Sequence, residues 1–275
     1  MDTRIIKTKI WVALLLVYII WGSTYLAIHY AVATLPPFLM TGTCFLVSGF
    51  LLYVWRRLAG DQAPTPRQWL AAVVIGLLLL VGGSGSISLA EQKVASGIAA
   101  LLIGSVPLWM TAIEALQPGG MHPNWLGVLG LLIGFGGIFL LVAPSLTGRA
   151  NVEINLLGIS LLIVAALSWS IGSIYNRHAD LPASSLLSTG MEMLAGGMGL
   201  YLTGTLKGEW VTLVLSRVTL SSWLGLIYLI VLGTLVAFTA YAWLLRNARC
   251  RLFLLMPMSI PWWRFYWAAS LRENL

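Results

Sequence analysis

The chain has 275 residues, of which 59% are hydrophobic and 9% are charged, and its mean hydropathy is +0.90. This composition excludes a soluble globular domain of this size and indicates a polytopic membrane protein. The net charge of +7 is spread over short connections between apolar stretches, so we interpret it as orientation signal and headgroup contact and expect no nucleic-acid partner.

Eight apolar stretches follow one another along the chain. A transmembrane helix needs roughly 20 apolar residues, and open strands are excluded because they leave amides unpaired in lipid. The expected spans are 10–33, 37–55, 69–90, 94–116, 124–143, 155–176, 183–205 and 221–245. The sequence therefore predicts an all-α protein whose main partner is the lipid bilayer.

Lysine and arginine predict the orientation, because short cytoplasmic connections retain these residues. With the N-terminus inside, the inner side holds ten of them and the outer connections hold four. The inner ones are Arg4, Lys7, Lys9, Arg56, Arg57, Arg67, Arg177, Arg246, Arg249 and Arg251. The outer ones are Lys93, Arg149, Lys207 and Arg217. We expect a multi-pass protein of the cell inner membrane with a cytoplasmic N-terminus, although the inner connection 117–124 carries neither residue.

Two halves of the chain repeat each other. The segment Trp-Gly-Ser-Thr-Tyr at 21–25 has a counterpart, Trp-Ser-Ile-Gly-Ser, at 169–173, 148 positions later. Farther along the offset is 154, since Trp-Leu at 69–70 recurs at 223–224. An odd number of spans in each half places the second copy upside down, as in transporters built from inverted repeats with a binding site between the copies.

The residues after about 248 do not read as a span, because they combine two prolines with Arg264 among aromatic residues. A one-base shift of the reading frame near 248–250 turns 256–261 into Tyr-Ala-Tyr-Val-Asn-Pro. The recovered proline at 261 then lies 154 positions after Pro107. We therefore expect a first repeat at 1–148 and an incomplete second repeat at 149–275 whose tail is frame-shifted.

These features resemble the EamA-type permeases of the drug/metabolite transporter superfamily, most closely its YedA-like members. The similarity runs continuously over about 10–247 and continues in the frame-corrected tail. The pieces that carry it are 18–25, 36–37, 90–92, 96–100, 106–108, 125–127 with Gly134, 168–169 and 192–195. The resemblance implies ten helices in two inverted five-helix repeats and export of small metabolites across the inner membrane.

The chain departs from the family pattern in two places. The arginine that the family commonly carries in its second helix is replaced by Cys44, and no segment corresponds to a tenth helix. Cys44 and Cys250 suggest neither a disulfide scaffold nor a metal site.

The first helix of each repeat supplies the candidate substrate-binding residues. Aromatic side chains stack on amphipathic substrates and hydroxyl groups orient them, so the repeated pattern favours a central cavity. Packing between helices is the competing interpretation for any one of these residues. The candidates are Trp21, Ser23, Thr24, Tyr25, Trp169, Ser173 and Tyr175.

Glu192 lies midway along the seventh expected span, where an ionisable group is costly unless it faces a cavity or a partner. We predict that it couples transport to protons or binds a substrate amine, with a structural hydrogen-bonded carboxylate as the alternative. Its counterpart in the first repeat is Cys44, 148 positions earlier.

Two backbone features complete the candidates. Pro107 interrupts the fourth span and is a candidate hinge, because proline frees carbonyl groups at membrane depth. The glycine-rich stretch 82–86 favours close packing or bending of the third span. It also contains Gly-x-Ser-Gly, typical of intramembrane serine proteases, but His29, His122 and His178 all lie near span ends.

We interpret the chain as a secondary transporter that exports small metabolites or drugs by alternating access. A non-transporting membrane protein, such as an inactive remnant, is the alternative, and an intramembrane protease is a remote one. No phosphate loop, zinc-ligand pair or dinucleotide motif occurs, so we expect no cofactor and no metal. A small-molecule substrate is the expected ligand, and a homodimer is left open.

Overall fold

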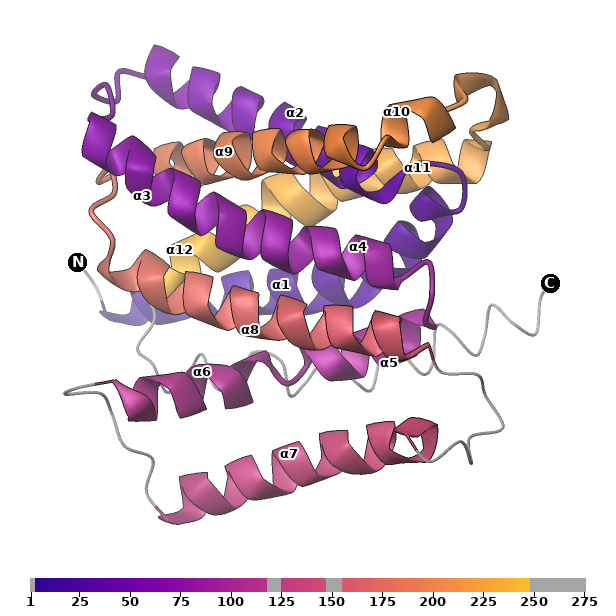
Figure 1. Ribbon diagram of the computed structural model, residues 1–275. Helices are drawn as coiled ribbons and strands as arrows, with labels where there is room; N and C mark the ends of the chain where they lie inside the picture. Colours follow the sequence, from indigo (N-terminus) through magenta and orange to yellow (C-terminus); the bar gives the residue numbers. More distant parts are fainter. Residues whose placement is uncertain (1–2, 118–124, 147–154, 248–275) are drawn as a thin grey trace.

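The computed structural model describes residues 3–117, 125–146 and 155–247, and within these ranges every regular element is helical. The helices lie side by side in one bundle (Figure 1). They are α1 (Thr3–Val32), α2 (Pro37–Leu58), α3 (Pro66–Gly76), η1 (Leu77–Gly85), α4 (Ser86–Ala90), α5 (Ser96–Ile103), α6 (Val106–Leu116), α7 (Trp125–Leu146), α8 (Leu156–His178), α9 (Ser185–Leu206), α10 (Glu209–Thr212), η2 (Leu215–Arg217), α11 (Leu220–Tyr228), η3 (Leu229–Phe238) and α12 (Thr239–Asn247).

The predicted class, an all-helical multi-pass membrane protein, is confirmed for this part of the chain. Six helical stretches are long and apolar enough to cross a bilayer, and two further helices, α7 and α9, are 22 residues long. The predicted tail features at 248–275, His122 and the connection 118–124 lie outside the described residues.

Helix starts follow local capping chemistry. Thr65 accepts a hydrogen bond from the Gln68 backbone N–H, and the Gln68 side chain accepts one from the Thr65 N–H, which forms a capping box. The Asn155 side chain caps α8 by accepting from Gly158 N–H at 3.2 Å, and Ser184 caps α9 in the same way. These polar caps mark where the chain leaves a connection and enters an apolar span.

Helices α2 and α9 form an antiparallel pair at one edge of the bundle (Figure 1). A Cβ atom on Gly49 would lie 2.8 Å from Leu194 N, and one on Gly190 would lie 2.9 Å from Tyr53 N. The backbones therefore approach closely through glycine, as expected for helix packing in lipid.

The third span of each half contains a π-helical segment, η1 in the stretch Pro66–Ala90 and η3 in the stretch Leu220–Leu245. Helix α8 packs along the first of these spans, since Gly82 lies against Ser168 and Gly83 against Trp169. Helix α1 packs along the second span, where Thr24 contacts Gly233. The space between these packed pairs holds the candidate site.

Candidate functional site

A central cavity of about 150 Å³ lies between α1, α2, the two π-containing spans, α5, α6 and α8. Its polar and aromatic lining residues are Trp21, Thr24, Tyr25, Thr41, Cys44, Phe45, Ser84, Ser88, Trp169, Thr234, Phe238 and Tyr241. Aliphatic residues, Gly104, Gly233 and Pro107 complete the described lining. The cavity thus draws residues from both halves of the chain.

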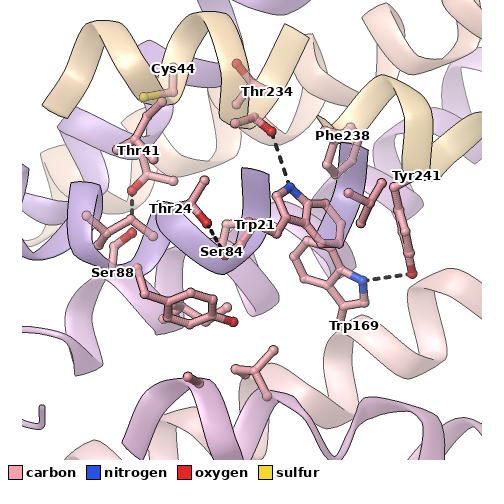
Figure 2. A pocket seen from close by; sticks show the side chains of 18 of the residues that line it. Trp21, Thr24, Thr41, Cys44, Ser84, Ser88, Trp169, Thr234, Phe238 and Tyr241 are labelled. Carbon is pink, nitrogen blue, oxygen red and sulfur yellow. Dashed lines mark hydrogen bonds between the residues drawn. The ribbon is translucent and has the colours of Figure 1, made fainter. Parts of the chain in front are cut away.

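An aromatic cluster of Trp21, Trp169, Phe238 and Tyr241 closes one end of the central cavity (Figure 2). The rings of Trp21 and Trp169 meet edge to face with their centroids 5.5 Å apart, and Tyr241 lies 4.9 Å from Trp21. Such pairs stabilise a packing beyond the area they bury. Because one tryptophan comes from each half, the cluster joins the two halves at this end.

Hydrogen bonds fix the rings of the aromatic cluster. Trp21 Nε1 donates to the Gly233 carbonyl at 3.3 Å, and Trp169 Nε1 donates to the Tyr241 hydroxyl at 2.9 Å. The Ser173 hydroxyl lies 2.6 Å from the same Tyr241 oxygen. A buried indole N–H usually finds a partner of this kind, and here the partners hold both indoles in place.

Small hydroxyl residues from α2 and the π-containing spans lie away from the rings. The Thr41 and Ser88 hydroxyls are 2.7 Å apart, and Thr234 Oγ1 donates to the Ile230 carbonyl at 2.6 Å and contacts the Ser48 hydroxyl. Cys44 lies near them and is 2% exposed. These contacts tie α2 to the third span of each half.

The fourth span is broken beside the central cavity, where α5 ends at Ile103 and α6 begins at Val106. Pro107 has no N–H, and Leu108 N–H donates to the Ser105 carbonyl at 2.9 Å. The i to i−4 ladder is therefore interrupted beside Gly104, which lines the cavity. The structure places the predicted hinge residue at this break.

Four of the seven predicted substrate-binding residues line the central cavity, namely Trp21, Thr24, Tyr25 and Trp169. Three do not. Ser173 lies behind the cavity wall, where it contacts Tyr241. The Ser23 hydroxyl donates to the Ile20 carbonyl and lies 2.5 Å from the Tyr228 hydroxyl. Tyr175 is 40% exposed on the outside of α8.

Glu192 is buried in α9, with 1% of its surface exposed, and is not among the described residues that line the central cavity. Asn176 Nδ2 of α8 donates to Glu192 Oε1 at 2.9 Å. Next to Asn176, Arg177 forms an ion pair with Glu114 at the end of α6. A hydrogen bond thus joins the predicted coupling carboxylate to α8, one residue before the arginine that pairs with α6.

Several cavity residues were missed in the sequence, chiefly Thr41, Ser88, Thr234 and Tyr241. The usable signal was a hydroxyl group inside an otherwise apolar span, because such groups are enriched where membrane helices pack against one another. Within the described residues, no group of three or more His, Cys, Asp or Glu side chains is placed to hold a metal ion.

Comparison with known proteins assigns the family. Over 236 residues, covering 86% of this chain and 74% of the relative, the chain is 38% identical to the uncharacterized inner membrane transporter YedA of Escherichia coli K12. The chain belongs to the EamA-like transporter family. The family match itself covers residues 8–143.

Other relatives agree with this assignment. The EamA chain is 24% identical over 247 residues to a probable amino-acid metabolite efflux pump of Escherichia coli K12, covering 84% of this chain and 76% of the pump. A solved crystal structure that is 21% identical has a TM-score of 0.65 and covers 94% of this chain and 86% of its own. The protein is therefore a membrane transporter of the drug/metabolite superfamily, and the predicted family is confirmed.

Proposed function

We propose that this EamA protein is a secondary transporter of the inner membrane that exports small metabolites or drugs by alternating access. The central cavity is the substrate site. The observation that carries the proposal is the position of this cavity between the two halves, closed at one end by Trp21 from the first half and Trp169 from the second. Alternating access then requires these two rings to separate.

Reciprocal packing supports the proposed inverted repeats. Helices α1 and α8 run in opposite directions (Figure 1). A Cβ atom on Gly196 would lie 2.7 Å from the Gly76 carbonyl, and the counterparts of these residues, Ser48 and Ile230, are joined by a hydrogen bond of 3.2 Å. Gly196 lies 148 positions after Ser48, and Ile230 lies 154 positions after Gly76. Each half therefore contacts the other through corresponding residues.

The inverted design also accounts for the two π-helical segments. An offset of 154 carries η1 (Leu77–Gly85) onto 231–239, which overlaps η3 (Leu229–Phe238). Segments of π-helix are frequent at functional sites. Both segments contribute to the cavity wall, through Ser84 in the first and Thr234 in the second.

Glu192 is the proposed coupling carboxylate, although it does not line the cavity. Its partner Asn176 lies on α8, the helix that also carries Trp169 and Ser173. A change in the protonation of Glu192 alters the Asn176 contact and is transmitted along α8 to the aromatic cluster. Buried acids inside the membrane mark proton pathways in many transporters.

Flux assays in proteoliposomes, with and without a pH gradient, test the function. Trp21→Ala is expected to lower flux at least about tenfold because it removes a ring of the cavity end. Trp11→Ala is the matched control, since Trp11 lies on the same helix with 56% of its surface exposed. Glu192→Gln is expected to keep substrate binding and lose the dependence on the pH gradient. If a correctly folded protein shows no flux, the result favours the alternative of a non-transporting membrane protein.

The protease alternative has less support. Ser84, the serine of the Gly-x-Ser-Gly sequence, lines the central cavity, but no histidine is among the described lining residues. The nucleophile would need a base within hydrogen-bond reach. His178 Nδ1 lies 2.9 Å from the Ile174 carbonyl near the end of α8, away from this wall.

A further inference from the structure

The charge of the central cavity limits the ligand that it can hold. None of the described lining residues is Asp, Glu, Lys, Arg or His, and most are aliphatic or aromatic. A charged group that enters such a site loses its hydration and gains no opposite charge in return. The wall therefore disfavours anions, cations and zwitterions alike.

The hydrogen-bond donors of the wall are mostly occupied by the protein itself. The indole N–H groups of Trp21 and Trp169 donate to Gly233 and Tyr241, and the Thr24 hydroxyl donates to the Trp21 carbonyl at 2.8 Å. Thr234 donates to a backbone carbonyl as well. A carboxylate or phosphate needs several donors at once, and the described wall does not present such a set.

The volume of the central cavity limits the size of the ligand group that it can hold. A cavity of about 150 Å³ with an apolar lining matches the volume of about 150 Å³ at which an engineered apolar protein cavity stays dry and binds benzene. The ligand group that fits is one aromatic or aliphatic ring with a short substituent. The aromatic cluster supplies rings against which such a group packs.

A cation held by the aromatic faces is the competing ligand, because tryptophan attracts cations through its ring face. Here Trp21 and Trp169 meet at an interplanar angle of 89°, so one ring face is covered by the edge of the other. No described carboxylate lines the cavity to support a cation.

We propose that the central cavity selects uncharged, single-ring solutes and rejects charged analogues of the same size. This inference rests on the proposed transport function and names its substrate class.

Three probes of matched size test the class, namely tyrosol, tyramine and 4-hydroxyphenylacetate. All three carry a phenol ring with a two-carbon substituent that ends in a neutral hydroxyl, an ammonium or a carboxylate. Equilibrium binding to the purified protein in nanodiscs, corrected with empty nanodiscs, is expected to be at least about tenfold weaker for each charged probe. Equal or tighter binding of either charged probe overturns the inference.

Two variants locate the binding. Ser84→Phe places a ring in the cavity and is expected to abolish tyrosol binding, while Ser86→Phe, two positions along and outside the described lining, keeps it. Cys44→Asp adds a carboxylate to the wall and is expected to shift the preference toward tyramine. Tyrosol binding that survives Ser84→Phe in a folded protein places the ligand elsewhere and overturns the proposal.

The binding and flux assays fail in distinguishable ways. If none of the three probes binds while the reconstituted protein transports another solute, the substrate class is wrong and the transport function stands. If the folded protein transports no solute at all, the proposed transport function itself is wrong. We expect tyrosol to bind, Ser84→Phe to abolish this binding, and neither charged probe to bind as tightly.

Discussion

At the scale of single residues, the connection between α2 and α3 carries a titratable contact outside the membrane. Arg56 Nε donates to Asp61 Oδ2 at 2.8 Å and Arg56 Nη2 donates to Asp61 Oδ1 at 2.7 Å. This arginine, together with the Ser184 hydroxyl, lowers the pKa of Asp61 from 3.8 to about 2. The folded protein thus binds this proton more weakly than the unfolded chain does, so the carboxylate stabilises the fold above about pH 4 and loses that effect toward pH 2.

We therefore expect Asp61→Asn to lower the melting temperature between about pH 5 and 7, with a gap to the parent that narrows below about pH 4. Thermal unfolding across this pH range measures the gap. Asp180→Asn, at an exposed acid in the α8–α9 connection, is the control. A gap that stays constant down to pH 3 contradicts the stated cause.

Single residues also show what a sequence motif can and cannot reveal. Trp21 and Trp169 were predictable as cavity residues because the repeat presents them in both copies. Ser23 and Tyr175 do not line the central cavity, because each residue turns the helix by about 100° and neighbouring positions cannot all share one face. Glu192 accepts a hydrogen bond from Asn176 of α8, a contact that only the packed structure reveals.

At the scale of elements, α2 depends on a cap from another part of the chain. Its N-cap residue, Pro36, has no side-chain hydrogen bond to offer. The Glu209 carboxylate instead accepts from Phe38 N–H at 3.1 Å and from Leu39 N–H at 2.9 Å. An acid at this position satisfies two free N–H groups and opposes the positive end of the helix dipole.

Glu209→Ala is expected to destabilise the protein by about 1–2 kcal/mol, the usual cost of a lost N-cap. Glu209→Gln keeps one acceptor oxygen and should retain part of the stability. Thermal unfolding of the purified variants ranks the parent, Gln and Ala forms in that order. Equal melting temperatures for the parent and Glu209→Ala mean that α2 does not depend on this cap.

The α2–α9 contact depends on glycine. A Cβ atom at Gly49 would lie 2.8 Å from Leu194 N and from Met193 Cβ, so Gly49→Ala forces the two helices apart. Overpacking of this kind costs about 1–3 kcal/mol, and we expect a lower melting temperature. Gly22→Ala is the matched control, because a Cβ there meets nothing within 4 Å. Equal effects of the two substitutions refute the proposed close contact.

The element boundaries were largely predictable, and the irregularities within elements were predictable in part. Apolar runs alone predicted, to within a few residues, where the described spans begin and end. Pro107 likewise predicted the break between α5 and α6, because proline removes a backbone donor. The segment η1 includes most of the glycine-rich stretch 82–86, where close packing or bending was predicted, whereas η3 carries no comparable local signal.

At the scale of the whole molecule, the α2–α9 pair is tied at both ends. Glu209, which follows α9, holds the start of α2, while Asp61, which follows α2, contacts Ser184 at the start of α9. The two acids are 148 positions apart, the same offset that relates Trp21 to Trp169. Such reciprocity is what an inverted repeat requires.

The inverted design predicts that corresponding connections face opposite sides of the membrane. Gln62, in the α2–α3 connection, and Ser216, in the α10–α11 connection, are related by the offset of 154, and both side chains are exposed. Their connections lie at opposite ends of the bundle (Figure 1). In a background with Cys44→Ala and Cys250→Ala, we expect an impermeant maleimide to label Gln62→Cys only from the cytoplasmic side, where arginine is concentrated, and Ser216→Cys only from the outside. Labelling of both cysteines from one side removes the inverted arrangement, and with it the reason to expect alternating access around a cavity between two matching halves.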